Sequence, residues 1–266
     1  MLVGAALGAP GAPPAWRSVG AAMLAVSLFY IAGMALNDVV DAAVDRHERP
    51  DRPIPSGAIP LRQATWFILI SFGIGMALFT WLSAISAAFG AALAVCIIAY
   101  DYLHKRWVGA VILMGACRGL IYLIAAGAVS HHLDWRLLWP MAFILTTYTI
   151  AITLVARIET TDHIDARRWL AIAMPFVVPA AAWILTPTRW LRPIVFGVVT
   201  VGWLAWTAWQ VFRSPPRIMQ AVPAWLAGMC LLDAYILALL NQPVPAGLAL
   251  ACFVLTRLGQ RRIAGT

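Results

Sequence analysis

Charge is scarce in this sequence of 266 residues, because only 11% of the residues are charged whereas 62% are hydrophobic. Long hydrophilic stretches are missing too, since no polar segment longer than about two dozen residues interrupts the apolar runs. A soluble domain of this size could not bury so much apolar surface. The composition therefore excludes a soluble protein and predicts a single membrane-embedded domain over residues 1–266, with no soluble domain attached.

Cysteine is rare as well, and the four cysteines lie far apart inside apolar segments, at positions 96, 117, 230 and 252. This spacing predicts neither a disulfide framework nor a zinc site, and we expect core thiols. The net charge is +8, but the basic residues are scattered through short loops and form no long stripe. Membrane topology explains them more simply than nucleic-acid binding, so we expect no nucleic-acid partner.

Nine apolar stretches are long enough to cross a bilayer as helices, which takes about 20 residues. They lie near residues 17–37, 63–83, 87–103, 108–129, 137–158, 169–187, 192–212, 219–240 and 243–258. The first 14 residues are apolar and lack the basic region of a signal peptide, so we expect the end of a further helix that begins upstream of Met1. The expected fold is all-α, a polytopic transmembrane bundle of about nine to ten helices.

The loops between these stretches divide the charges unequally between the two membrane faces. If every stretch spans, 14 of the 19 basic residues fall on one face and four on the other, which places the first face in the cytoplasm. Nine of the eleven acidic residues lie on that same face, although acidic residues contribute little to topology. We therefore expect a multi-pass protein of a bacterial inner membrane with a functional acidic site on the cytoplasmic face.

The strongest motif is NDVVDAAVD at residues 37–45, where the first long apolar stretch leaves the membrane. On a helix, Asp38, Asp41 and Asp45 lie within about 60° of one another. Three carboxylates on one face at the membrane edge repel, so a cation should hold them together. Magnesium binds such hard oxygen ligands together with phosphate oxygens of a substrate. The alternative is an ordinary solvated helix end.

The next segment is RPDRPIPSG at residues 49–57, in which three prolines exclude a regular helix. Arg49 and Arg52 follow the acids closely, and an arginine side chain can bind a phosphate through two hydrogen bonds. We expect both arginines to bind substrate phosphate together with Asn37. Alternatively, they are only positively charged turn residues at the cytoplasmic face.

Residues 37–57 resemble the NDxxDxxxD and RPIPSG signature of the UbiA superfamily of intramembrane prenyltransferases. The resemblance extends over nearly the whole chain in the spacing of helices and loops. Within the superfamily the chain looks most similar to the EboC-like branch, judged from Tyr100-Asp101 with Lys105, Cys117-Arg118-Gly119 and Leu232-Asp233-Ala234. The resemblance implies a helical bundle that binds a prenyl diphosphate through Mg²⁺ between two acidic loops.

A second acidic loop, RIETTDHID at residues 157–165, lies on the same predicted face as the first. The resemblance implies that Glu159 and Asp162 bind a second metal ion. The loop departs from the family pattern, because its acids stand three residues apart instead of four and the first is Glu instead of Asp. The alternative is an acid cluster that only pairs with Arg167 and Arg168.

Two further basic residues stand out. Lys105 is the only lysine, and the resemblance implies that it binds diphosphate. The family has a tyrosine four residues before this lysine. Here Tyr100 stands five residues before Lys105 and Tyr102 stands three residues before it. Arg118 lies mid-span, where a charge is expensive and usually paired or functional. It either binds substrate or forms an ion pair with Asp233, the other mid-span charge.

Together these features predict a Mg²⁺-dependent intramembrane prenyltransferase, which moves an isoprenoid group from a prenyl diphosphate to an aromatic or other lipophilic acceptor. The resemblance implies that Asp38, Asp41, Asp45 and Lys105 are catalytic, because the metal ion and fixed cations stabilise the leaving diphosphate. The alternative is a transporter component or a non-catalytic prenyl-lipid binding protein that retains the diphosphate site. The lipid bilayer is the expected environment, and no feature of the sequence indicates an oligomeric state.

Overall fold

The computed structural model describes residues 1–158, 166–186, 191–212 and 218–262, which form ten α-helices and no strand. The helices are α1 (Leu2–Gly8), α2 (Trp16–Glu48), α3 (Leu61–Leu82), α4 (Ala84–Leu103), α5 (Ala110–Val129), α6 (Trp135–Ile158), α7 (Ala166–Leu185), α8 (Leu191–Phe212), α9 (Ile218–Leu239) and α10 (Pro243–Arg262). Within the described ranges, eight helices are long and apolar enough to cross a membrane, and the apolar part of α7 at Phe176–Leu185 is shorter. The predicted all-α membrane bundle is confirmed.

Each of the nine predicted apolar stretches corresponds to one helix from α2 to α10. The clearest difference is at α2, which runs on from the predicted end at residue 37 to Glu48 and has 33 residues. Its extension contains mostly valine and alanine between the acids and has no proline, so the helical backbone continues beyond the apolar stretch. The acidic motif therefore stands on a rigid helix and not on a loop.

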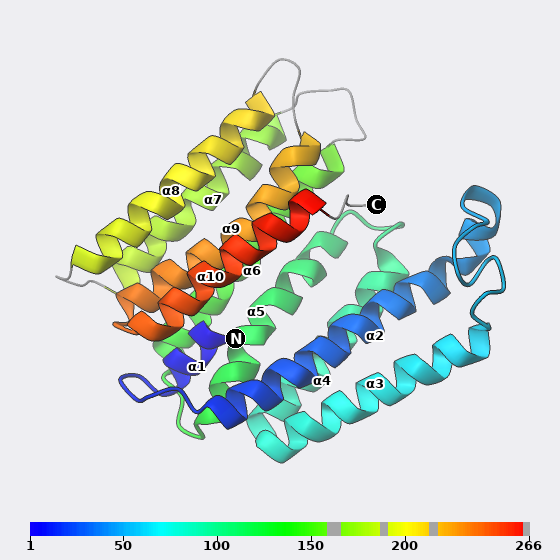
Figure 1. Cartoon of the computed structure of the whole chain (residues 1–266), viewed down its shortest axis with the longest axis horizontal. Coiled ribbons are helices and arrows are strands. Elements are labelled where there is room, and N and C mark those ends of the chain that lie inside the picture. The colour runs from blue at the N-terminus through cyan, green and yellow to red at the C-terminus, as the bar shows by residue number, and fades with distance from the viewer. Residues whose placement is uncertain (159–165, 187–190, 213–217, 263–266) are drawn as a thin grey trace.

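The helices differ in how much of their apolar surface is covered by protein. In α5, α6 and α9, 56%, 56% and 67% of the spanning segment is buried, whereas the figures are 28%, 22% and 22% in α2, α3 and α4. Figure 1 shows α2 beside α3 at one side of the bundle and α8 at the other side, with α5, α6 and α9 between them. The core thus lies around α5, α6 and α9, and α2 to α4 form a looser layer against it.

Small residues set how closely the central helices approach. A Cβ atom added at Gly119 would overlap the Thr146 hydroxyl and the Ala142 carbonyl of α6, and one added at Gly115 would overlap the Thr146 carbonyl. Such small-xxx-small pairs let two helix backbones pack closely where no hydrophobic effect drives association. The α5–α6 contact therefore fixes the rotation of α5 about its axis, and with it the direction in which Arg118 points.

Polar side chains inside the bundle are hydrogen-bonded to neighbouring backbones. The Tyr148 hydroxyl donates to the Trp225 carbonyl at 2.9 Å, and the Ser83 and Ser86 hydroxyls donate to carbonyls of α5 at 2.8 and 2.9 Å. A polar group without a hydrogen-bond partner is destabilising by roughly several kcal/mol in lipid, as it is in other apolar media. These bonds hold α6 to α9 and α4 to α5.

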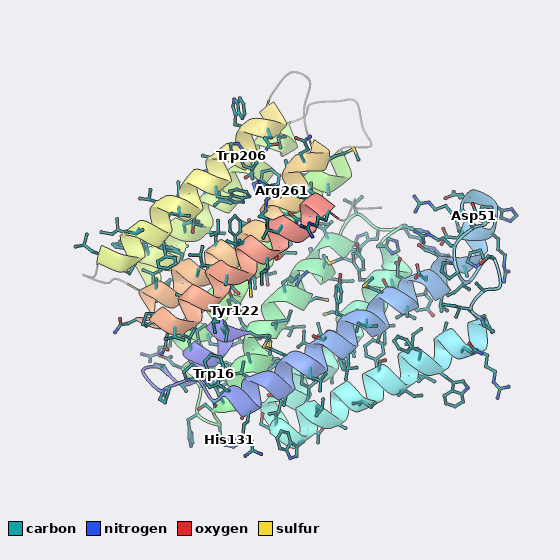
Figure 2. All side chains as sticks on the ribbon, in the orientation of Figure 1. Trp16, Asp51, Tyr122, His131, Trp206 and Arg261 are labelled. Atoms are coloured by element: carbon teal, nitrogen blue, oxygen red, sulfur yellow. The ribbon has the colours of Figure 1, made fainter. Side chains whose placement is uncertain are left out.

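The two ends of the bundle carry different residues. Figure 2 shows Asp51 at the end of the bundle where α2 terminates, and Trp16 and His131 at the opposite end, with Tyr122 between them. The acidic motif, the turn that follows it and the α4–α5 connection lie at the Asp51 end, as the predicted alternation of loops requires. This end contains the candidate site.

Candidate active site

The last turns of α2 present the three aspartates of the first acidic motif. Asp41 and Asp45 are buried, with 8% and 5% of their surface exposed, whereas the side chain of Asp38 is 53% exposed. Asp38 and Asp45 contact the same guanidinium group, that of Arg52, so they lie on one side of the helix as the spacing predicts. The structure shows this for two of the three acids, and the expected stack of all three carboxylates stays a prediction.

A tight turn brings Arg52 back onto the helix that it follows. The Arg52 amide donates to the Arg49 carbonyl at 3.1 Å and the Arg52 carbonyl accepts from Ser56 at 2.9 Å, so the proline-rich segment forms turns and no regular helix. Nη1 of Arg52 then donates to Asp45 Oδ2 at 2.8 Å and to Asp38 Oδ1 at 3.4 Å. One arginine thus neutralises two acids, whereas Arg49 is exposed and forms no ion pair with any described residue.

Lys105 reaches the third acid from the α4–α5 connection. Its Nζ lies 2.6 Å from Asp41 Oδ1, and this ion pair joins residues that are far apart in the sequence. The structure thus brings Lys105 to the acidic motif, and its predicted role in binding diphosphate stays a prediction. Of the two tyrosines considered near Lys105, Tyr100 lines the adjacent cavity and stacks on His104, whereas Tyr102 is exposed.

A cavity of about 710 Å³ opens beside these acids, between α2, α4 and α5. Its polar end contains Asn37, Asp38 and Asp101, and its deeper wall contains apolar side chains such as Phe29, Leu93 and Ile121. Such a gradient suits an amphiphile with a charged head and an apolar tail. Its lining residues Tyr30 and Met34 are exposed on the outer surface of α2, so the deeper part of the cavity borders the lipid-facing surface.

Arg118 lines this cavity together with Asp38 and Asp101. The alternative prediction, an ion pair between Arg118 and Asp233, is wrong, because the ion pairs among the described residues involve only Arg52 and Lys105. Asp233 accepts a hydrogen bond of 2.5 Å from the Tyr122 hydroxyl instead. Tyr122 lies four residues after Arg118 on α5. It is Tyr122 that supplies the hydrogen bond to Asp233, and Arg118 lines the cavity.

Asp101 is a site residue that the sequence analysis did not identify. It is 6% exposed, lies in the last turn of α4 and lines the cavity. Asn37 Nδ2 donates to Asp101 Oδ1 at 3.3 Å, across 64 residues of sequence. Two sequence signals were present, a carboxylate at the end of an apolar span and its place four residues before Lys105, where the family has a tyrosine. Neither signal tells a cavity-facing acid from a solvated helix end.

The second acidic loop lies outside the described residues, so Glu159 and Asp162 stay predictions, as does the alternative that pairs this loop with Arg167 and Arg168. Within the ranges that the structure describes, no group of three or more His, Cys, Asp or Glu side chains is close enough to hold a metal ion alone. Magnesium does not require three protein carboxylates, because this ion commonly takes only one or two and completes its coordination shell with water and substrate phosphate. Asp38 and Asp41, in the last turns of α2, supply two such carboxylates.

Comparison with known proteins identifies the family to which this helical bundle belongs. The model of the UbiA prenyltransferase family matches residues 1–222, which is most of the chain. The chain belongs to the UbiA prenyltransferase family. The resemblance read from the motifs is thereby confirmed, and so is the enzyme class, prenyltransferase, at the level of the family. The finer placement in the EboC-like branch and the single domain over residues 1–266 stay predictions.

Several curated relatives are archaeal and are named digeranylgeranylglyceryl phosphate synthase. The protein of Metallosphaera sedula is 30% identical over 196 residues, which cover 69% of each chain, and that of Halobacterium salinarum is 29% identical over 233 residues, which cover 84% of this chain and 78% of the relative. The match to the Pyrococcus abyssi protein is 34% identical over 121 residues and spans only 44% of that relative.

Two solved structures share the fold. A structure of a digeranylgeranylglyceryl phosphate synthase superposes with a TM-score of 0.70 at 13% identity and covers 91% of both chains. The apo structure of a UbiA homolog from Aeropyrum pernix K1 superposes with a TM-score of 0.56 at 17% identity and covers 97% of this chain and 93% of the other. At these identities the likeness shows the helical fold alone.

Proposed function

We propose that this chain transfers an isoprenoid group from a prenyl diphosphate to a lipophilic acceptor inside the membrane, in a reaction that requires Mg²⁺. The observation that supports this most is the cavity between α2, α4 and α5, which joins an acid-rich mouth to an apolar wall. A prenyl diphosphate has the same polarity profile along its length. Family membership supports the reaction class, and the substrates are proposals that rest on the geometry of the site and on the names of the relatives.

The diphosphate would lie at the mouth of the cavity. Asp38 and Asp41 would hold Mg²⁺ there, with Asp45, Glu159 and Asp162 as further predicted ligands. The ion supplies positive charge next to the departing diphosphate. Arg52 and Lys105 pair with the acids of α2, and each can donate to phosphate oxygens instead when the diphosphate is bound. Arg49 is exposed beside them and would contact the outer phosphate.

Asn37 stands where the polar mouth meets the apolar wall, next to the point at which the carbon–oxygen bond would break. Its amide group donates to Asp101 and lies beside Asp38 in the sequence. The isoprenoid chain would continue along the deeper wall, among side chains such as Phe29 and Ile97. Apolar walls exclude water, which protects an allylic cation from hydrolysis and strengthens the electrostatic interactions at the mouth.

Arg118 supports an acceptor that carries an anionic group. It is the only arginine or lysine among the described residues that line the cavity, and it lies on the wall opposite α2. The relatives are named for a glyceryl phosphate product, so we propose a phosphate-bearing lipophilic alcohol as the acceptor class, with aromatic acids as the second class. In both classes the arginine would bind the anion by charge-assisted hydrogen bonds.

Eight helices of the described chain can span a membrane, and the protein is an integral multi-pass membrane protein. We propose that the mouth of the cavity faces the cytoplasm of a bacterial inner membrane. The excess of arginine and lysine in the loops on the side of the acidic motif supports this orientation.

The direct test is release of diphosphate from a panel of prenyl diphosphates by the purified full-length chain, with and without Mg²⁺. Geranylgeranylglyceryl phosphate and 4-hydroxybenzoate serve as acceptors. We expect Mg²⁺-dependent release together with a prenylated product, and loss of both in the double variant Asp38→Ala/Asp41→Ala. Asp51→Asn is the matched control, because Asp51 is an exposed acid in the adjacent turn. Tight Mg²⁺-dependent binding without release would contradict the enzyme and favour a carrier.

A further inference from the structure

Asp101 has an oxygen that nothing in the described chain satisfies. Its carboxyl group is buried, Oδ1 accepts a hydrogen bond from Asn37, and Oδ2 is buried without any hydrogen-bond partner. The two cations that pair with the acids of α2 are not its partners, because Arg52 contacts Asp38 and Asp45 while Lys105 contacts Asp41. Asp101 therefore differs from the acids of α2, each of which has a positively charged partner.

A buried carboxylate oxygen without a partner is destabilising, typically by about 1–3 kcal/mol and by more when the group is charged. Nearly all such atoms in folded proteins find a donor, so an exception calls for an explanation such as a ligand. Asp101 lines the cavity, where a donor could come from a bound molecule. The prenyl diphosphate has no hydroxyl or amine to donate from its apolar chain. A hydroxyl group of the acceptor is such a donor.

We propose that Asp101 is a catalytic residue that binds the acceptor through its nucleophilic hydroxyl group and takes the proton of that hydroxyl. This inference rests on the proposed transferase function and names the acceptor as an alcohol or phenol that reacts through oxygen. The hydroxyl oxygen forms a bond to C1 of the prenyl group, and the bond between C1 and the diphosphate oxygen breaks. Its electron pair leaves with the diphosphate, and the hydroxyl proton passes to the Asp101 carboxylate.

Two neighbours orient this carboxylate and the acceptor. The hydrogen bond from Asn37 holds Oδ1 and so fixes the rotation of the carboxyl group, which makes Asn37 a positioning residue. Arg118 lines the same cavity from α5, a different helix, and would hold the anionic group of the acceptor. An acceptor bound at both points would present its hydroxyl group near the polar mouth, where the bond to diphosphate breaks.

The test compares Asp101→Asn with wild type, using geranylgeranyl diphosphate as donor and geranylgeranylglyceryl phosphate as acceptor. Two quantities are measured in the same preparation, the rate of prenyl transfer and the rate of diphosphate release by hydrolysis without acceptor. We expect the ratio of transfer to release to fall at least about 100-fold, the usual contribution of a positioned acid–base group. This ratio does not depend on the amount of folded protein in the preparation. Asp101→Ser repeats the test with a smaller side chain.

A second readout separates proton transfer from a purely structural role. An acceptor analogue with a thiol in place of the hydroxyl loses its proton more readily, so it should regain a large part of the transfer rate in Asp101→Asn. Asp51→Asn again serves as the acid-to-amide control and should keep the wild-type ratio. Asn37→Ala should lower the ratio less than Asp101→Asn does.

Three outcomes would overturn the proposal. The first is a ratio in Asp101→Asn equal to that of wild type. The second is an equal fall in release and transfer, which would make Asp101 part of the diphosphate site. The third is a failure of the thiol analogue to rescue transfer. Failure of the proposed function looks different, because the wild-type chain itself would then release no diphosphate from any prenyl donor.

Discussion

Two carboxylates of this protein, Asp101 at the end of α4 and Asp233 within α9, show how differently an acid inside the bundle can be used. Asp233 on α9 accepts a hydrogen bond of 2.5 Å from Tyr122 on α5, inside the most buried part of the bundle. Asp101 on α4 has only a 3.3 Å bond from Asn37 to one oxygen and lines a cavity of about 710 Å³. The first acid joins two core helices, and the second is left incomplete beside space that can hold a ligand.

The same contrast holds for the surrounding helices. Helices α5, α6 and α9 bury most of their spanning surface and are tied together by bonds such as that from Tyr148 to Trp225. Helices α2 and α4 bury little, and their polar residues gather at one end around the cavity. Stability and chemistry thus reside in different layers of one bundle. Substitutions in the two layers should therefore change different measured quantities.

Loss of Lys105 should have the largest effect on turnover. Lys105→Gln leaves Asp41 without its 2.6 Å partner and removes a cation that would neutralise the leaving diphosphate. We expect the rate of diphosphate release to fall about 100- to 1,000-fold, the range for removal of one group that stabilises transition-state charge. Arg106→Gln is the control, because Arg106 is the adjacent exposed cation. Equal losses in both variants would contradict a specific role for Lys105.

Loss of Arg52 should have a smaller effect of the same kind. Arg52→Gln removes a guanidinium that is one-third exposed and bridges Asp38 and Asp45. We expect a loss of about 10-fold in diphosphate release, since solvent screens part of its charge. Extra Mg²⁺ should restore part of the rate, because the two acids are then free to bind it. Arg62→Gln, at an exposed position at the start of α3, should behave as wild type.

Replacement of Arg118 should affect the acceptor and not the donor. Arg118→Gln keeps a hydrogen-bond donor of similar length but removes the charge that would hold the anion. We expect KM for geranylgeranylglyceryl phosphate to rise about 10-fold, while KM for the prenyl diphosphate stays unchanged. Arg136→Gln, at an exposed position in the first turn of α6, is the control. A higher KM for the donor alone would place Arg118 in the diphosphate site instead.

Tyr122→Phe should change stability with little effect on catalysis. It removes the donor to Asp233 and leaves a mid-span carboxylate without that partner. We expect the free energy of unfolding to fall by about 1–3 kcal/mol, seen as a lower Tm in detergent. The ratio of prenyl transfer to diphosphate release should equal that of wild type. Tyr102→Phe, at an exposed tyrosine, should leave Tm unchanged, and a changed ratio in Tyr122→Phe would break the separation of the two layers.

The spans and the acidic motif could be predicted from the sequence because their signals are local. The predicted span 108–129 nearly matches α5, and the spacing of Asp38 and Asp45 correctly places both on the side of α2 that Arg52 contacts. The end of α2 was predicted too early, because hydropathy marks the edge of the membrane and not the end of a helix. Helix-forming residues carried α2 on to Glu48.

Composition and motif spacing were enough to predict the class, the family and the residue types of the mouth, because burial of apolar surface and the cost of a charge in lipid depend on them. The contact partners of these residues depend instead on how the helices pack. Whether Arg118 meets Asp233 or the cavity depends on the rotation of α5, which its close packing on α6 through Gly115 and Gly119 sets. The contact between Asn37 and Asp101 likewise joins residues 64 positions apart, and it exists because α2 and α4 pack side by side.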